Sequence, residues 1–387
     1  MMSNSRPAFN IRVIPVVFFI FVLPGNGFAQ SNVFVWGNNR YGQWNVPSGL
    51  TNATAIAAGG EHILALKANG TVVAWGLNSR GQTNVPAGLT NVVAIAGGNA
   101  HSLALRANGT VAAWGDNTYG QTNVPTDLTN VVAIAGGGGH GGYSLALKSD
   151  GTVVAWGQYY NGSGFVPMFV PAGLTNVVAV AADDTHNLAL TGDGTMVAWG
   201  YGPTNVPVGL TNVVAIATDE GCNMALKAGG MVAVWGNNYY GQTNVPANLT
   251  NVVAIASGRW HCVALKSDGK VTAWGQYYDG TYYQTMTVPA GLSNVVTIAA
   301  GEWTSVALLG NGPPPETVLV SNPMCTSNGF CLSLPMRNGG VYRLEYLNAL
   351  TGTNWIPLPL VAGNGGVQTL IDPAVPSAQR FYRVRRW

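Results

Sequence analysis

The dipeptide Trp-Gly recurs along most of this chain at a nearly constant spacing. Between Asn32 and Gly312 the successive spacings are 39, 39, 42, 43, 36 and 39 residues. Self-similarity at this period indicates an array of structural repeats, each burying its apolar face against its neighbours. Because the tryptophans recur at one position of the repeat, we interpret them as packing residues. They are Trp36, Trp75, Trp114, Trp156, Trp199, Trp235 and Trp274.

One repeat has the pattern of a small antiparallel sheet. In the clearest copy, Val92–Ala96, Ser102–Arg106 and Val111–Trp114 have the composition of strands. Asn108-Gly109 strongly favours a two-residue hairpin turn. Residues 122–125, Thr-Asn-Val-Pro, are expected to add a short outer strand, since proline is tolerated at a sheet edge. A four-stranded unit of about 40 residues is typical of a β-propeller blade. The rival, a β-helix, has shorter coils and lacks this hairpin chemistry.

The two ends of the repeat region carry complementary parts of one unit. Val33–Gly37 is a third strand without a first or second, and Val295–Leu309 is a first and second strand without a third. Joined, they complete one blade, which makes seven with the six whole units. The sequence therefore predicts an all-β fold, a seven-bladed β-propeller closed by a blade shared between both ends.

The first residues predict export. Residues 1–29 combine a basic start, an apolar core at Val13–Leu23 that is too short to span a bilayer, and a small-residue cleavage site ending at Ala29. We expect this signal to be removed. The mature protein would then be periplasmic, extracellular or at the cell surface, without a transmembrane segment.

The repeats are expected to occupy residues 30–312, and a different domain follows them. Pro313–Pro315 is a stiff linker. Residues 316–387 predict a small β-sandwich-like domain for sorting, surface retention or accessory binding. Its candidate strands are Thr317–Val320, Phe330–Leu334, Val341–Leu347, Val367–Ile371 and Phe381–Val384.

Charge and cysteine content narrow the function classes. Charged residues make up 8% of the chain and the net charge is +2, too small to indicate binding to nucleic acid or membranes. Cys325 and Cys331 flank a predicted turn and could form a hairpin disulfide in an oxidising compartment. Cys222 and Cys262 lie one strand position apart in successive repeats, so we expect them to face opposite ways and to remain free thiols.

The repeat matches the pattern AIAxGxxHxxALxxxGxVxAWGxNxxGQ in most units between Asn32 and Gly312. In this it resembles the regulator of chromosome condensation family, whose fold is a seven-bladed propeller. The amino-acid sequence of the repeat is also similar to that of secreted propellers that inhibit β-lactamases. The last domain resembles a module at the ends of extracellular proteins of planctomycete and verrucomicrobial type. The resemblance of this last domain is carried by Tyr342–Tyr346, Asn354-Trp355, Asp372-Pro373 and Arg380–Arg383.

The loops of the repeat sort onto two faces. In a four-stranded meander, the loop between the first two strands and the loop after the third share one face, and the Asn-Gly turns share the other. The repeats differ in length mainly in the loops of the first face. His140 lies 16 residues before the next repeat tryptophan, where the other copies have 13, and longer loops follow Trp156 and Trp274. Insertions on one face of a rigid scaffold are typical of functional loops.

Aromatic and charged side chains concentrate on that same face. Rigid aromatics bury a large area at small entropic cost, as a contact surface requires. We predict a partner-binding surface made of Tyr41, Asp116, Tyr119, Tyr159, Tyr160, Tyr239, Tyr240, Arg259, Trp260, Tyr277, Tyr278, Glu302 and Trp303. The resemblance to inhibitory propellers implies partner contact for Asp116, Tyr119, Tyr239, Tyr240, Trp260 and Trp303. The alternative is that these tyrosines cap their own blades.

The histidines share one repeat position, so we assign them a structural hydrogen-bonding role. They are His62, His101, His140, His186 and His261. Side chains spaced around a ring cannot converge on one ion, and no metal site is expected. Calcium binding by Asp183-Asp184 is a weaker alternative to a solvated acidic loop.

No catalytic motif stands out in the sequence. We predict a secreted, monomeric, non-enzymatic protein without a cofactor, which binds a protein or polysaccharide through the aromatic face. One alternative is an extracellular carbohydrate-active enzyme, a lyase or glycosidase, with paired carboxylates in a central pocket. Another is activity like that of a guanine nucleotide exchange factor, which only the family resemblance implies.

Overall fold

The computed structural model is built from β-strands. Its described parts are residues 32–50, 52–139, 141–310, 321–326, 329–336, 340–347, 355–364, 366–373 and 380–386. These residues contain no helix long and apolar enough to cross a membrane. The predicted export signal, the proline linker and the strand expected at Thr317–Val320 lie outside them.

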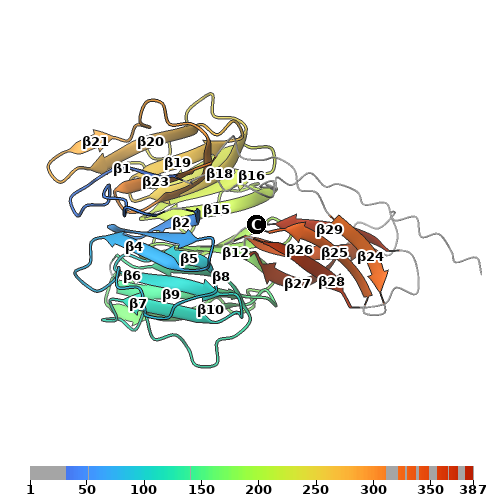
Figure 1. The fold of residues 1–387 in the computed structure, drawn as a ribbon. Coiled ribbons are helices and arrows are strands. Elements are labelled where there is room, and N and C mark those ends of the chain that lie inside the picture. Colours follow the sequence, from blue (N-terminus) through green and yellow to red (C-terminus); the bar gives the residue numbers. More distant parts are fainter. Residues whose placement is uncertain are drawn as a thin grey trace, which may run out of the picture.

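Seven antiparallel sheets of three or four strands follow one another through the described part of residues 32–310 (Figure 1). Six of these blades are continuous in sequence. Their strands are β2 (Ala53–Ala58), β3 (His62–Lys67) and β4 (Val72–Gly76); β5 (Val92–Gly97), β6 (His101–Arg106) and β7 (Val111–Gly115); β8 (Val131–Gly137), β9 (Gly141–Lys148), β10 (Val153–Tyr160) and β11 (Phe165–Pro167); β12 (Val177–Ala182), β13 (His186–Thr191) and β14 (Met196–Gly200); β15 (Val213–Asp219), β16 (Cys222–Lys227) and β17 (Val232–Gly236); and β18 (Val252–Gly258), β19 (His261–Lys266), β20 (Val271–Tyr278) and β21 (Tyr283–Thr285).

The remaining blade is built from both ends of the repeat region. It consists of β22 (Val295–Ala300), β23 (Thr304–Leu309) and β1 (Asn32–Gly37). β1 runs antiparallel to β23, with Trp36 opposite Ser305. The first strands contact one another in the order β2, β5, β8, β12, β15, β18 and β22, and β22 in turn contacts β2. The sheets therefore stand around one axis, the arrangement of a propeller.

The outer fourth strand differs from the prediction. Only two blades have one, and β11 and β21 both arise from the longer loops after Trp156 and Trp274. In the other blades the corresponding segment, Thr-Asn-Val-Pro or, after β1, residues 44–47, is turn and coil in the described residues. There the Thr122 amide donates to Asn117 Oδ1 and the Asn123 amide to the Gly120 carbonyl. Local turn bonds thus take up the backbone groups that a ladder would need.

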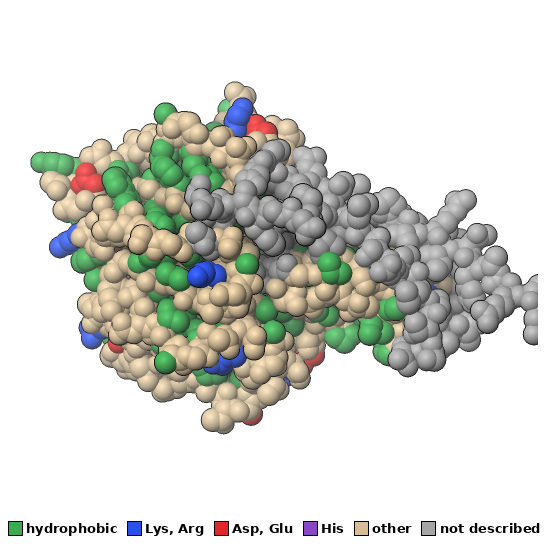
Figure 2. All heavy atoms as spheres, viewed as in Figure 1, with side chains coloured by type: hydrophobic (Ala, Val, Ile, Leu, Met, Phe, Trp, Pro, Cys, Tyr) green, Lys and Arg blue, Asp and Glu red, His purple; other side chains and the backbone are tan. Residues whose placement is uncertain are grey.

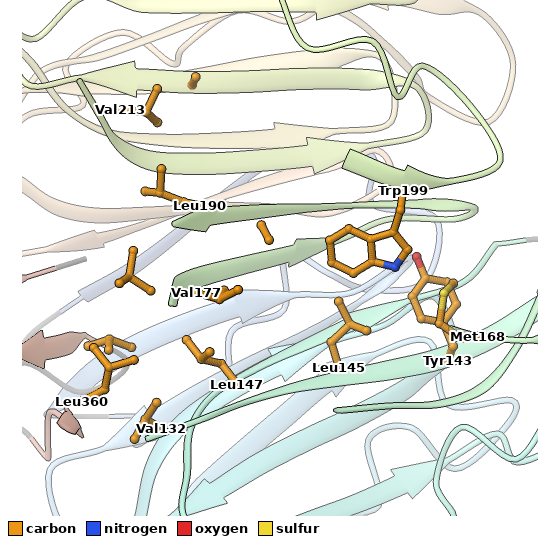
Figure 3. Packing of buried hydrophobic residues seen from close by; sticks show 14 of the residues in the cluster. Val132, Tyr143, Leu145, Leu147, Met168, Val177, Leu190, Trp199, Val213 and Leu360 are labelled. Atoms are coloured by element: carbon orange, nitrogen blue, oxygen red, sulfur yellow. The ribbon is translucent and has the colours of Figure 1, made fainter. Parts of the chain in front are cut away.

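Apolar side chains of neighbouring blades interlock between the sheets. In Figure 3, Leu145 and Leu147 of β9 pack with Val177 of β12 and Trp199 of β14. Trp235 is half-buried, and the other repeat tryptophans are buried. Four of the buried rings also donate Nε1 to the carbonyl of a loop glutamine in the preceding blade, at 2.8–2.9 Å. The pairs are Trp75 with Gln43, Trp114 with Gln82, Trp156 with Gln121 and Trp274 with Gln242.

The last part of the chain forms two facing three-stranded sheets. One is β24 (Ser321–Thr326), β25 (Gly329–Pro335) and β28 (Val367–Asp372), and the other is β27 (Ile356–Ala362), β26 (Val341–Leu347) and β29 (Phe381–Arg386). Phe330, Tyr342 and Tyr382 fill the core between them. The strands that the sequence analysis missed, β24 and β27, contain prolines and lie at sheet edges, where proline is tolerated.

The predicted cysteine hairpin is present as a backbone structure. In the β24–β25 pair, Cys325 lies opposite Phe330 and Cys331 lies opposite Met324. The Cys325 side chain lies outside the described part of the structure, so its disulfide with Cys331 stays a prediction.

This domain packs against the propeller near β8 and β12 (Figure 1). The Leu360 amide donates to the Ser149 carbonyl at 2.9 Å, and Arg343 Nη1 donates to Asn176 Oδ1 at 2.9 Å. Ser149 lies in the turn between β9 and β10, and Asn176 ends a linker between blades. We call the end of the propeller that carries these turns the turn face, and the small domain contacts it. Charged side chains are few and scattered on the side of the molecule in Figure 2.

Candidate interaction surface

The histidines lie at interfaces between blades. In three cases, Nε2 is within 3.0 Å of a serine hydroxyl on the next blade. The pairs are His62 with Ser102, His101 with Ser144 and His261 with Ser305. Burial lowers the pKa of His62 and of His261 to about 3. These rings are therefore neutral at physiological pH and act as fixed links between blades.

One histidine assignment needs correction. His140 itself lies outside the described residues, but the register shows which residue takes its expected place. Tyr143 lies opposite Gly157, as His101 lies opposite Gly115. The Tyr143 hydroxyl donates to the His186 carbonyl at 3.1 Å, so it too links two blades. The three extra residues therefore precede this position. The usual spacing of 13 residues before the repeat tryptophan also leads from Trp156 to Tyr143, so residue type rather than spacing misled the assignment of His140.

Cys222 and Cys262 meet at another blade interface. Their Sγ atoms are 3.6 Å apart and both side chains are fully buried. Both are free thiols in the structure, as expected, but they lie against each other rather than apart. The two side chains do project from opposite faces of their own sheets. Because neighbouring sheets stack, these two faces pack against each other.

The loops between first and second strands hold one another near the ring axis. The Arg259 amide donates to the Glu302 carbonyl, the Glu302 amide to the Gly60 carbonyl, and the Gly60 amide to the Gly98 carbonyl, at 3.1–3.2 Å. Glycine is required at Gly60 because a Cβ there would lie 2.6 Å from the Asn99 carbonyl oxygen. We call the end of the propeller that carries these loops the loop face.

A small acidic cavity opens among these loops. Its volume is about 90 Å³, and its walls combine glycines with Asp183, Asp184, Asp219, Glu220 and Glu302. Pockets that enclose small-molecule ligands measure roughly 300–1,000 Å³. The cavity can therefore hold a few waters or the tip of one side chain, and it is too small to enclose a sugar ring.

The carboxyl groups of this cavity have shifted proton affinities. Burial, together with Asp183 and Glu302, raises the pKa of Asp184 to about 7. Burial and the same acidic surroundings also raise the pKa of Asp219. Asp183 is the exception: burial opposes its charge, but His186 Nδ1 lies 2.6 Å from Asp183 Oδ2 and lowers its pKa. No group of three His, Cys, Asp or Glu side chains in the described residues is arranged to hold a metal ion.

The shifted pKa of Asp184 predicts a pH-dependent stability. Its folded pKa of about 7 exceeds its usual value of 3.8, so ionisation costs stability above pH 7 and the cost fades as pH falls toward 4. Asp184→Asn should raise the melting temperature by about 2–6 °C at pH 8 and by less at pH 5, measured by calorimetry. Asp193→Asn, at an exposed turn where Thr191 lowers the pKa, should give no gain. An equal gain from Asp184→Asn at both pH values would contradict the expectation.

Five aromatic side chains from three blades form one aromatic cluster on the loop face. Its members are Tyr240, Trp260, Tyr278, Tyr283 and Trp303. Trp260 is central: its ring stacks on Tyr240 at a centroid distance of 4.0 Å and meets Trp303 edge-on at 4.4 Å and Tyr283 at 4.9 Å. Tyr278 lies 5.4 Å from Tyr283. Tyr283 is exposed, Tyr240, Trp260 and Tyr278 are half-buried, and Trp303 is buried.

Arg259 joins the aromatic cluster to the acidic cavity. Its guanidinium lies 5.3 Å from the ring centroid of Trp260 and 5.1 Å from that of Trp303. It also pairs with Glu220 and Glu302, which line the cavity. These contacts hold the two indole rings in fixed positions, and a rigid surface loses less entropy than a mobile one when it is covered.

The paired tyrosines at the ends of two blades divide by strand alternation. In β20, Tyr278 faces the aromatic cluster, whereas Tyr277 packs against the interior of its blade. In β10, Tyr159 is buried in the core and Tyr160 lies on the surface, 5.6 Å from the exposed Phe165. Only one tyrosine of each pair is therefore available to a partner.

Other predicted site residues lie apart from the aromatic cluster. Tyr119 contacts Phe165 at 4.5 Å and belongs to a second aromatic group with Tyr160. Tyr41 lies beneath the Arg40 guanidinium, and Asp116 bonds the Thr118 hydroxyl within its own loop. The fully projecting Tyr239 is 88% exposed.

Tyr283 and Phe165 were missed as site residues. Both lie in the insertions after the third strand, where β11 and β21 turn them back toward the preceding tyrosines. The length of these insertions was visible in the sequence, but the return strand that aims the rings was not.

Comparison with known proteins agrees with the repeat assignment. Residues 53–82, 92–121 and 252–284 match the sequence model of the Regulator of chromosome condensation (RCC1) repeat. No curated protein matches the chain in sequence.

Solved structures with this fold are distant in sequence. Prp20p from Saccharomyces cerevisiae is 20% identical, with a TM-score of 0.57 over 74% of this chain and 92% of that one. Human WBSCR16 is 21% identical, with a TM-score of 0.55 over 73% and 99%. The CRINKLY ectodomain of the Arabidopsis thaliana receptor kinase ACR4 is 21% identical, with a TM-score of 0.50 over 68% and 97%. These likenesses confirm a propeller fold with RCC1-type repeats.

Proposed function

We propose that this propeller of RCC1-type repeats is an exported, non-enzymatic binding protein whose aromatic cluster grips a partner protein. The carrying observation is the contact of Trp260 with Tyr240, Tyr283 and Trp303, which unites loops of three blades into one surface. Tryptophan, tyrosine and arginine are the residues on which binding energy at protein interfaces concentrates.

The dimensions of the loop face favour a macromolecule over an enclosed substrate. The central cavity of about 90 Å³ leaves no room for a saccharide between its carboxylates, as a glycosidase or lyase would need. The aromatic cluster instead lies on the rim, where a partner's surface can cover several rings at once.

The position of the small domain also supports this choice. Its contacts through Leu360 and Arg343 lie on the turn face, at the opposite end of the strands from the aromatic cluster. A partner can therefore approach the loop face without displacing it. Prp20p was described together with its binding to Gsp1p and histones. For this chain, nucleotide exchange rests on fold resemblance alone, and inhibition of a β-lactamase rests only on the likeness of repeat segments noted in the sequence analysis.

The proposal is tested by affinity capture from the organism's extracellular medium. The bait is the purified mature chain, run beside Trp260→Ala/Tyr283→Ala and beside Met231→Ala, an exposed apolar position near the turn face. We expect wild type and Met231→Ala to retain one protein, and the double variant to lose it.

Treating the medium before capture shows whether the retained partner is a protein or a glycan. Loss of retention after protease treatment of the medium supports a protein partner, whereas loss only after periodate oxidation supports a glycan. Equal capture by all three baits would remove the aromatic cluster as the binding surface.

A further inference from the structure

One blade interface carries a pair of cysteines at the positions where three other interfaces carry a histidine–serine pair. Where neighbouring blades place a histidine against a serine, such as His62 against Ser102, the interface between β16 and β19 places Cys222 against Cys262. Cys222 lies opposite Gly236 in its sheet, as His62 lies opposite Gly76, so it holds the histidine position. Cys262 holds the serine position.

The geometry brings the two sulfurs into van der Waals contact. They are 3.6 Å apart, both side chains have no exposed surface, and Cys262 Sγ also contacts the Gln242 carbonyl. A disulfide requires an S–S distance of about 2 Å, which small side-chain rotations can supply from this starting point. We propose that Cys222 and Cys262 form a disulfide that links these two blades when the chain folds in an oxidising compartment.

The reaction needs an oxidant of the thiol–disulfide oxidoreductase class. The Cys222 thiolate attacks the oxidoreductase disulfide and forms a mixed disulfide, and the Cys262 thiolate then attacks the Cys222 sulfur. The protein loses two protons and two electrons, and the oxidoreductase leaves as a dithiol. The exchange must precede packing of the two blades, because both sulfurs are buried afterwards. In the folded chain, burial and the neighbouring Cys222 raise the pKa of the Cys262 thiol, which keeps it protonated and unreactive.

The link would lie beneath the aromatic cluster. Tyr240 follows β17 in one blade and Trp260 precedes β19 in the other, and their rings stack across the same interface. A covalent bond between the two blades would hold this stack together.

The test uses the full chain, refolded in a glutathione redox buffer and alkylated under denaturing conditions. Digestion after lysine, arginine and glutamate releases Gly221–Lys227 and Trp260–Lys266. We expect mass spectrometry to find these two peptides as one cross-linked species that reductant separates. Reductant should also lower the melting temperature by about 5–10 °C, as expected for cross-links that close loops of this length.

Cys222→His/Cys262→Ser is the matched control, since it introduces the histidine–serine pair of three other interfaces while leaving Cys325 and Cys331 in place. This variant has no cysteine pair at the β16–β19 interface. Reductant should therefore lower its melting temperature less than that of the wild type. Recovery of both wild-type peptides as separately alkylated thiols would overturn the proposal, whether or not the variant folds.

Discussion

Replacing Trp114 by alanine should lower the free energy of unfolding by about 3–5 kcal/mol, the usual cost of deleting a buried aromatic side chain. The ring is 7% exposed, packs between two blades, and donates Nε1 to the Gln82 carbonyl at 2.9 Å. Truncation would leave a cavity and remove one of the two hydrogen bonds that the Gln82 carbonyl accepts, the other being donated by the Ser102 hydroxyl. Denaturant titration followed by tryptophan fluorescence and circular dichroism measures the change.

Phenylalanine variants separate the hydrogen bond from the packing. Trp114→Phe keeps a ring but loses the bond to Gln82, whereas the buried Nε1 of Trp235 has no partner among the described residues. Trp114→Phe should therefore cost about 1 kcal/mol more than Trp235→Phe. Trp44→Ala, at a position 51% exposed, should change stability by less than about 0.5 kcal/mol. A similar loss for Trp44→Ala and Trp114→Ala would contradict the packing role.

Replacing Trp260 by alanine should weaken partner binding at least about 30-fold, corresponding to about 2 kcal/mol or more for a central interface aromatic. Trp260 contacts three rings and lies beneath the Arg259 guanidinium, so its loss also releases Tyr240 and Tyr283 from their fixed positions. The affinity is measured by surface plasmon resonance with the captured protein, once purified.

Trp260→Phe serves as the graded variant, because it retains an apolar ring in the aromatic cluster. It should recover part of the affinity. Tyr239→Ala removes a projecting ring that neighbours this cluster in sequence. The melting temperature of each variant is measured as well, so that a loss of affinity can be separated from a loss of folding. If Trp260→Ala bound as tightly as wild type while folding normally, the aromatic cluster would not be the contact surface.

The strand content and the phase of the repeats could be predicted because their causes are local. Asn108-Gly109 specifies its hairpin turn wherever it lies, and the incomplete unit at Val33–Gly37 needs the strands at Val295–Leu309. The register of β1 against β23 agrees with that expectation. The fourth strand failed for a local reason too, since the side chain of Asn117 competes for the Thr122 amide.

The candidate site depends on contacts between blades, which spacing cannot supply. Tyr143 takes the place expected for a histidine, and the sequence analysis missed it because it followed residue type to His140. Cys222 and Cys262 meet because two sheets stack, and Arg259 is held by acidic residues of two other loops. The sequence shows which residue types gather on the loop face. It does not show that Trp260, rather than Tyr277, would lie at the centre of an exposed cluster.

The pairing of β1 with β23 determines when during synthesis the propeller can close. β1 is made first and β23 last among the propeller strands, so their common sheet cannot assemble until the whole repeat region has been synthesised. Trp303 belongs to this late blade and packs against Trp260. A nascent chain, or one truncated before β23, therefore lacks the finished aromatic cluster. Under the function proposed above, the order of synthesis itself disfavours engagement of a partner before the repeat region is complete.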